Sequence, residues 1–152
     1  MTPTGIRTAV VTEKASWVRE MIEGIRGLPL DSYDDFLSDP RNAAAAESYL
    51  RRGLEGLLDM GRHVLAKGFG IAVTAYKDVA EQLTRQGVIS PEDGRVLRLM
   101  AGYRNRLVHF YHEISLVELH DICSRELADM ERICDAVLKW LRENPHRMDP
   151  SI

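Results

Sequence analysis

A long amphipathic segment limits the fold of this chain more than any other feature of the sequence. Asp39 and Pro40 provide an N-cap and a first-turn proline, which together signal the start of a helix. From there to about Lys67, apolar or small residues recur at intervals of three and four, at Ala43, Ala46, Leu50, Leu54, Leu57, Gly61 and Val64. A helix of this length must bury its apolar stripe against other helices. The alanines at 43–46 and Gly61 further predict that a neighbouring helix approaches closely.

The remaining apolar segments have the same helical period. They predict helices over residues 11–25, 74–86, 90–111 and 115–143, with a short helical turn at 31–37. Ser90 and Ser115 each precede an acidic residue by three positions and are expected to cap the helices that follow them. We therefore expect an all-α, up-and-down bundle of about five helices. It would form a single domain over 1–152, with a short flexible N-terminus (about 1–8) and a C-terminal tail (about 145–152).

Composition and charge limit the binding partners and the cellular location expected for this bundle. The formal net charge of −3 gives no global basic field, so any binding of nucleic acid must use a local patch such as Arg95, Arg98, Arg104 and Arg106. The sequence contains no apolar run near the roughly 20 residues that span a bilayer, and its start lacks an apolar signal core. Together with two cysteines expected to stay reduced, this predicts a soluble cytoplasmic protein without a membrane partner.

Polar groups gather where the helix over 90–111 ends. Arg104, Asn105, His109 and Tyr111 lie within eight residues, and a helical wheel places Arg104 near the middle of the apolar stripe. A buried charge requires a partner. In a regular helix His109 would point roughly 140° away from Arg104. The two converge only if the helix ends or distorts, if the arginine side chain swings round, or if a second copy of the chain completes the site.

Residues 104–111, with the sequence Arg-Asn-Arg-Leu-Val-His-Phe-Tyr, resemble the R-x4-H-x-Y motif of the HepT-like proteins. These proteins are a branch of the all-helical HEPN superfamily. The asparagine directly after the arginine and the tyrosine two residues after the histidine strengthen the match. So does the position of the motif, which comes late in a bundle and after a long second helix. The resemblance extends from about Val10 to Leu141.

This resemblance implies a metal-independent endoribonuclease that needs no cofactor, acts as a homodimer and serves as the toxin of a toxin–antitoxin pair. The implied antitoxin is an MntA-type nucleotidyltransferase that silences the toxin by adding AMP to the motif tyrosine, which is Tyr111 here. The implied substrate is RNA, either tRNA or mRNA. Chemistry is consistent with these roles, because imidazoles move protons near neutral pH and guanidinium groups bind phosphate. We expect His109 as general acid or base, Arg104 as phosphate stabiliser and Asn105 as an orienting group.

Each residue also has a structural interpretation. Arg104 could pair with an acid on a neighbouring helix, His109 could interact with the carbonyls of a helix end, and Tyr111 could be a half-buried aromatic residue. An alternative function is a non-catalytic HEPN module that binds a nucleotidyltransferase or a nucleotide. A metal site built from His109, His112, Glu113, Glu118 and His120 is disfavoured, because a helix break before Ser115 would spoil its spacing.

Overall fold

The computed structural model describes residues 4–109 and 114–150. Within these ranges the chain forms seven α-helices and one short 3₁₀ helix, and its β structure consists of one isolated bridge. The described part of the chain thus confirms the all-helical fold. The α-helices are α1 (Thr8–Arg26), α2 (Tyr33–Leu37), α3 (Pro40–Phe69), α4 (Tyr76–Arg85), α5 (Pro91–His109), α6 (Leu116–Arg125) and α7 (Leu127–Glu143), and the 3₁₀ helix is Pro145–Arg147.

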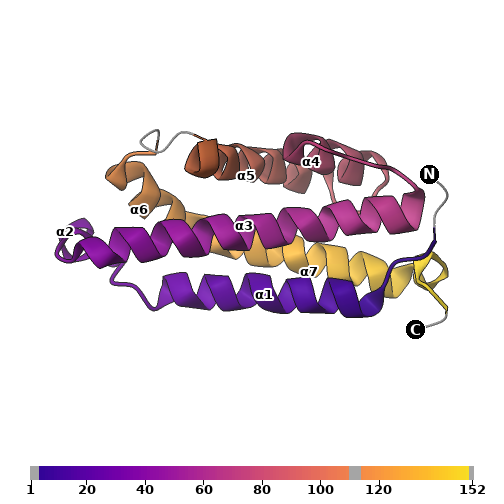
Figure 1. Ribbon diagram of the computed structural model, residues 1–152, viewed down its shortest axis with the longest axis horizontal. Coiled ribbons are helices and arrows are strands. Elements are labelled where there is room, and N and C mark those ends of the chain that lie inside the picture. Colours follow the sequence, from indigo (N-terminus) through magenta and orange to yellow (C-terminus); the bar gives the residue numbers. More distant parts are fainter. Residues whose placement is uncertain (1–3, 110–113, 151–152) are drawn as a thin grey trace.

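The bundle is organised around α3 (Figure 1). Helix α1 packs along one side of α3 and α4 and α5 pack along the other, while α7 completes the core between them. The long helices α1, α3, α5 and α7 alternate in direction along one axis, which confirms the up-and-down arrangement. No helix in the described residues combines the length and apolar character that a membrane crossing requires.

The apolar stripe of α3 is buried as its spacing predicts, with Leu50, Leu54 and Leu57 at most 2% exposed. Gly61 lies on this stripe where α4 crosses. A Cβ atom at Gly61 would stand 2.8 Å from Leu83 Cδ1 and 2.9 Å from Val79 Cγ1. The prediction of a close helix approach at Gly61 is confirmed, and the approach is made by Val79 and Leu83 of α4.

The helix starts at Ser90 and Ser115 agree with the sequence prediction, whereas one helix break and one helix start differ from it. The Ser90 and Ser115 hydroxyls accept hydrogen bonds from the Asp93 and Glu118 amides, each at 3.1 Å. The expected single helix over 115–143 is instead two helices, α6 and α7, that meet at Glu126. The apolar spacing continues through this junction, and Glu126 itself keeps a right-handed helical conformation, so periodicity does not reveal the break. Helix α4 starts after Ala75 rather than with Thr74 as its cap.

Residues near the two ends of the described chain pack against each other. Ile6 is fully buried and pairs with Met148 in the isolated bridge. The Ile6 amide donates to the Arg147 carbonyl at 2.8 Å, and the Asp149 amide donates to the Ile6 carbonyl at 2.9 Å. Within the described residues, the segments 4–8 and 145–150 are therefore part of the folded bundle.

Candidate functional site

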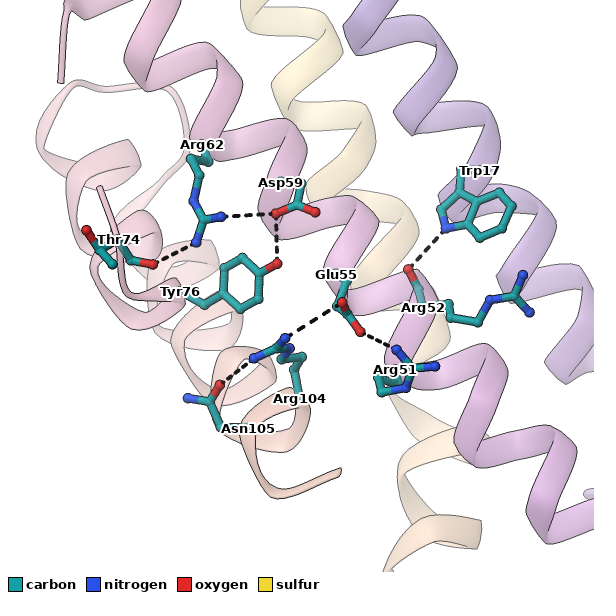
Figure 2. Close-up of polar contacts among 10 residues, drawn as sticks. All are labelled: Trp17, Arg51, Arg52, Glu55, Asp59, Arg62, Thr74, Tyr76, Arg104 and Asn105. Carbon is teal, nitrogen blue, oxygen red and sulfur yellow. Dashed lines mark hydrogen bonds and ion pairs between the residues drawn. The ribbon is translucent and has the colours of Figure 1, made fainter. Parts of the chain in front are cut away.

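Helix α5 places the Arg104 side chain on the face that packs against the rest of the bundle. The helix begins at the Ser90 cap and remains regular through His109. The face that carries Leu97, Met100 and Ala101 is buried, and the Arg104 side chain on the next turn is 20% exposed. An Arg104 terminal nitrogen lies 3.7 Å from the Glu55 carboxylate on α3, and the other donates to the Asn105 side-chain oxygen at 3.3 Å (Figure 2). Arg104 thus finds partners within its own chain.

This arrangement answers two questions left open by the sequence. The structural alternative, in which Arg104 pairs with an acid on a neighbouring helix, has a partner in Glu55 at 3.7 Å. The position of Arg104 on an apolar stripe is therefore explained without a second subunit. Helix α5 stays helical up to His109, so no distortion before His109 turns this residue toward Arg104. The Arg104 side chain instead donates to Asn105, the next residue of α5.

A tyrosine on α4 lies between two arginines. The Cζ atom of Arg104 is 4.7 Å from the centroid of the Tyr76 ring, and the Cζ atom of Arg62 is 4.6 Å from it. The Tyr76 hydroxyl donates to Asp59 at 2.8 Å, and Arg62 donates to the Thr74 carbonyl at 2.7 Å (Figure 2). Burial, and then the hydrogen bond to the Asp59 carboxylate, raise the pKa of Tyr76 to about 12. Tyr76 is therefore a neutral phenol at physiological pH.

These side chains border an open groove of about 750 Å³. Three of the residues predicted from the sequence, Arg104, Asn105 and His109, line the same groove. None of the described residues that line it is acidic, although the whole chain carries a net charge of −3. The nearby carboxylates of Glu55 and Asp59 belong to α3, where they lie 3.7 Å from Arg104 and 3.5 Å from Arg62. The lining residues are Arg62, Thr74, Ala75, Tyr76, Lys77, Gly102, Arg104, Asn105, Arg106 and His109.

The four arginines that the sequence suggested as a basic patch do not all lie at the groove. Arg104 and Arg106 border the groove, whereas Arg95 and Arg98 are exposed elsewhere on α5. Arg106 also forms a two-point ion pair with Glu118 of α6, with nitrogen–oxygen distances of 2.8 and 2.5 Å. This guanidinium group holds the pKa of Glu118 below its ordinary value.

The structure describes three of the five residues of the disfavoured metal site, His109, Glu118 and His120. Tyr111, His112 and Glu113 lie outside the described residues. The Nε2 atom of His120 is 2.8 Å from the Leu30 carbonyl oxygen, and its ring packs against Tyr33 and Phe36. Glu118 is paired with Arg106. Two of the five candidate ligands are thus engaged in contacts that hold the bundle together.

Sequence reasoning misses the residues that surround Arg104. Glu55 and Arg62 belong to α3 and Tyr76 to α4, outside the motif on α5 from which the site is predicted. One signal is available, because Glu55, Asp59 and Arg62 follow each other at intervals of four and three and so share one face of α3. The spacing does not show which helix covers that face. Only the structure identifies α4 and α5 as the helices that meet it.

A groove lined by cationic side chains, a histidine and an amide on an all-helical bundle defines a candidate site for a phosphate-rich ligand. Comparison with known proteins gives the family. The profile described as Ribonuclease HepT-like matches residues 18–137, and the chain belongs to this family. The resemblance of this chain to the HepT-like proteins is thereby confirmed.

One sequence relative and two solved structures are also similar to this chain. The chain is 25% identical over 112 residues to the tRNA nuclease HepT of Aphanizomenon flos-aquae (strain 2012/KM1/D3), and the match covers 73% of this chain and 76% of that protein. Among solved structures, the tri-AMPylated HEPN toxin of Shewanella oneidensis, in complex with its MNT antitoxin, has a TM-score of 0.77 at 22% identity, and the match covers 86% of this chain and 97% of that one. The cytosolic protein YutE of Bacillus subtilis, of unknown function, has a TM-score of 0.76 at 17% identity, with 92% and 94% covered. These two likenesses show the fold.

Proposed function

We propose that this protein is the endoribonuclease toxin of a HEPN/MNT toxin–antitoxin pair and that it cleaves RNA without a metal ion. The observation that carries the proposal is the groove in which Arg104, Asn105 and His109 meet with no acidic lining residue among those described. Membership of the Ribonuclease HepT-like family and the similarity to a tRNA nuclease support RNA as the substrate, with tRNA as the first class to test. The cytoplasm, where such RNA is found, is the proposed location.

The proposed reaction is an internal transfer of the phosphodiester. The 2′-oxygen of the RNA forms a bond to the adjacent phosphorus, the bond from phosphorus to the 5′-oxygen breaks, and a cyclic phosphate remains. One proton leaves the 2′-hydroxyl and one is delivered to the departing 5′-oxygen. His109 performs one of these transfers as general acid or base, since imidazole is suited to neutral pH. Arg104 stabilises the charge on the non-bridging oxygens, and Asn105 orients the reacting groups.

The contacts of Arg104 leave it able to receive a phosphate. Its distances of 3.7 Å to Glu55 and 3.3 Å to Asn105 are longer than the 2.7 Å bond that joins Arg51 to the same Glu55 carboxylate. If Arg104 turns toward a phosphate, Glu55 keeps Arg51 as its partner. Bidentate binding of an oxyanion by Arg104 thus costs the bundle no unpaired carboxylate.

We further propose that a nucleotidyltransferase of the MntA type silences the protein by adding AMP to Tyr111. Tyr111 follows His109 by two residues, and His109 borders the groove. Each added AMP brings a negatively charged phosphodiester. Attached beside a cationic groove, it would occupy the phosphate site and repel RNA. The tri-AMPylated Shewanella toxin provides a precedent for the modification.

The first experiment is cleavage of total cellular RNA and of purified tRNA by the protein in excess chelator. Wild type should cut, and His109→Ala should lose at least a hundredfold in rate, because proton transfer contributes about 10²–10⁴-fold. His146→Ala is the matched control, since His146 is exposed on the 3₁₀ helix and lies outside the groove. The intact mass of each sample must show no AMP, because modified protein would also be inactive.

Other results would contradict the proposal. If unmodified wild type cuts no RNA, the non-catalytic module that binds a nucleotidyltransferase or nucleotide becomes the better assignment. If AMP appears on a residue other than Tyr111 after coexpression with the partner, the modification site is wrong. The homodimer is also a proposal, and sedimentation as a monomer at micromolar concentration would reject it.

A further inference from the structure

We infer that Tyr76 is a positioning residue that holds the Arg104 guanidinium in place to receive the scissile phosphate. The inference rests on the proposed nuclease function, and it extends the site from the motif on α5 to a residue of α4. Tyr76 lies in the first turn of α4 and borders the same groove as Arg104 and His109.

The geometry provides a platform for the cation. The Arg104 Cζ atom lies over the Tyr76 ring, 4.7 Å from its centroid, which is within the range of a favourable cation–π contact. A guanidinium that uses its face against a ring keeps its N–H edge for hydrogen bonds, and a phosphate binds to that edge. The aromatic contact therefore need not break when the phosphate arrives.

The Tyr76 side chain is held in place by Asp59 and Arg62. Its hydroxyl donates to Asp59 at 2.8 Å, and Arg62 lies 4.6 Å from the ring centroid. Arg62 is tied to the Thr74 carbonyl at 2.7 Å and lies 3.5 Å from Asp59. Since Asp59 and Arg62 both belong to α3, the most central helix, the platform is fixed to the rigid part of the bundle.

Arg104 has few other restraints on its direction. Within the described residues its Nε atom is buried without a hydrogen-bond partner, and its contacts to Glu55 and Asn105 are long. An arginine side chain has many rotamers and loses entropy when one is selected. The Tyr76 ring reduces that loss before substrate binds, which should favour the transition state through orientation.

The test compares Tyr76→Leu with Tyr76→Phe in single-turnover and steady-state cleavage of tRNA. Removal of the ring should lower kcat about tenfold and change KM less than about threefold, because orientation rather than net charge is lost. Tyr76→Phe keeps the ring, loses the bond to Asp59, and should lie between wild type and Tyr76→Leu. In an Arg104→Ala background, Tyr76→Leu should cause no further loss, since both substitutions remove one interaction.

A matched control separates positioning from general loss of packing. Phe69 also supports an arginine, with the Arg147 Cζ atom 4.4 Å from its ring centroid, and it lies outside the groove. Phe69→Leu should lower thermal stability without reducing kcat once assays are run well below the melting temperature. Equal loss of kcat in Phe69→Leu and Tyr76→Leu would overturn the inference, as would a full tenfold loss when Tyr76→Leu is added to Arg104→Ala.

A second readout does not depend on cleavage. In the NMR spectrum of wild type, the Nε–H proton of Arg104, assigned by its disappearance in Arg104→Lys, should be shifted upfield by the ring. The shift should persist in Tyr76→Phe and vanish in Tyr76→Leu. An inactive wild-type protein with this shift would reject the nuclease proposal while supporting the Tyr76–Arg104 contact. Absence of the shift would reject the contact and therefore the positioning role.

Discussion

Arg106 and Glu118 form a two-point ion pair that ties the last turn of α5 to the first turn of α6, with distances of 2.8 and 2.5 Å. The two residues flank, in sequence, the segment 110–113 that contains Tyr111. Glu118 is also the residue whose amide donates to the Ser115 cap. The pair thus fixes both ends of the connection on which the proposed modification site lies.

Glu118→Gln should lower the free energy of unfolding by about 1 kcal/mol at pH 7, the upper range for a partly exposed pair with bidentate geometry. Arg106 holds the pKa of Glu118 below its ordinary value. The stabilisation is therefore present above the ordinary glutamate pKa and is lost as pH falls through the lowered folded value. Urea unfolding should show a larger difference between variant and wild type at pH 7 than at pH 3. Glu143→Gln is the control, because the Glu143 side chain is 61% exposed and lies 3.9 Å from Lys139.

Gly61→Ala should destabilise the bundle by about 1–3 kcal/mol, because its Cβ would press into Val79 and Leu83 of α4. Gly102→Ala serves as the comparison, since Gly102 is also helical and a Cβ atom added there would meet nothing within 4 Å. That substitution should stabilise by about 0.5–1 kcal/mol through helix propensity. Thermal unfolding measures both, and equal effects at the two glycines would contradict the close packing at Gly61.

The pH dependence of stability should include a contribution from His63. Its Nε2 atom accepts a hydrogen bond from the Arg7 amide at 3.1 Å. Burial, and then the nearby cations Lys67, Lys14 and Arg7, lower the pKa of His63. The unfolded chain therefore binds this proton more readily, and stability should fall as pH drops below the ordinary histidine pKa of about 6.5. His63→Gln should make the free energy of unfolding less dependent on pH between about 7 and 5, and an unchanged slope would exclude this role.

Cys123 and Cys134 should be unreactive in the folded protein. Both are fully buried, and burial raises the pKa of Cys123 to about 12 and that of Cys134 to about 11. Thiolate is the reactive form, so a thiol reagent at about pH 8 should label neither residue until denaturant is added. Rapid labelling of either cysteine in the native protein would show that α6 or α7 opens locally.

Most of the fold could be predicted from the sequence because local signals and apolar spacing act together in helices. The starts of α3, α5 and α6 are set by Asp39, Ser90 and Ser115, whose side chains make the cap bonds expected of them. The junction at Glu126 could not be predicted, because it contains no glycine or proline and interrupts neither the apolar spacing nor the helical backbone conformation.

The candidate site could be predicted only along α5. Arg104, Asn105 and His109 are close in sequence and follow one family pattern, whereas Glu55 and Tyr76 reach the site from other helices. The contribution of Glu55 depends on how α5 packs against α3, and that of Tyr76 on how α4 packs against α3, where Gly61 lies close to Val79 and Leu83. The catalytic roles assigned to Arg104, Asn105 and His109 stay predictions.

The bridge between Ile6 and Met148 has a consequence for the kinetics of unfolding. It joins residues almost at opposite ends of the chain, so it closes a very long loop and carries a corresponding entropic cost. We expect contacts of this kind to form after the helices have docked and to be largely absent from the folding transition state. Ile6→Ala should therefore accelerate unfolding and leave the folding rate nearly unchanged. The lifetime of the native bundle would then depend on two short segments at the end opposite α2 and α6 (Figure 1).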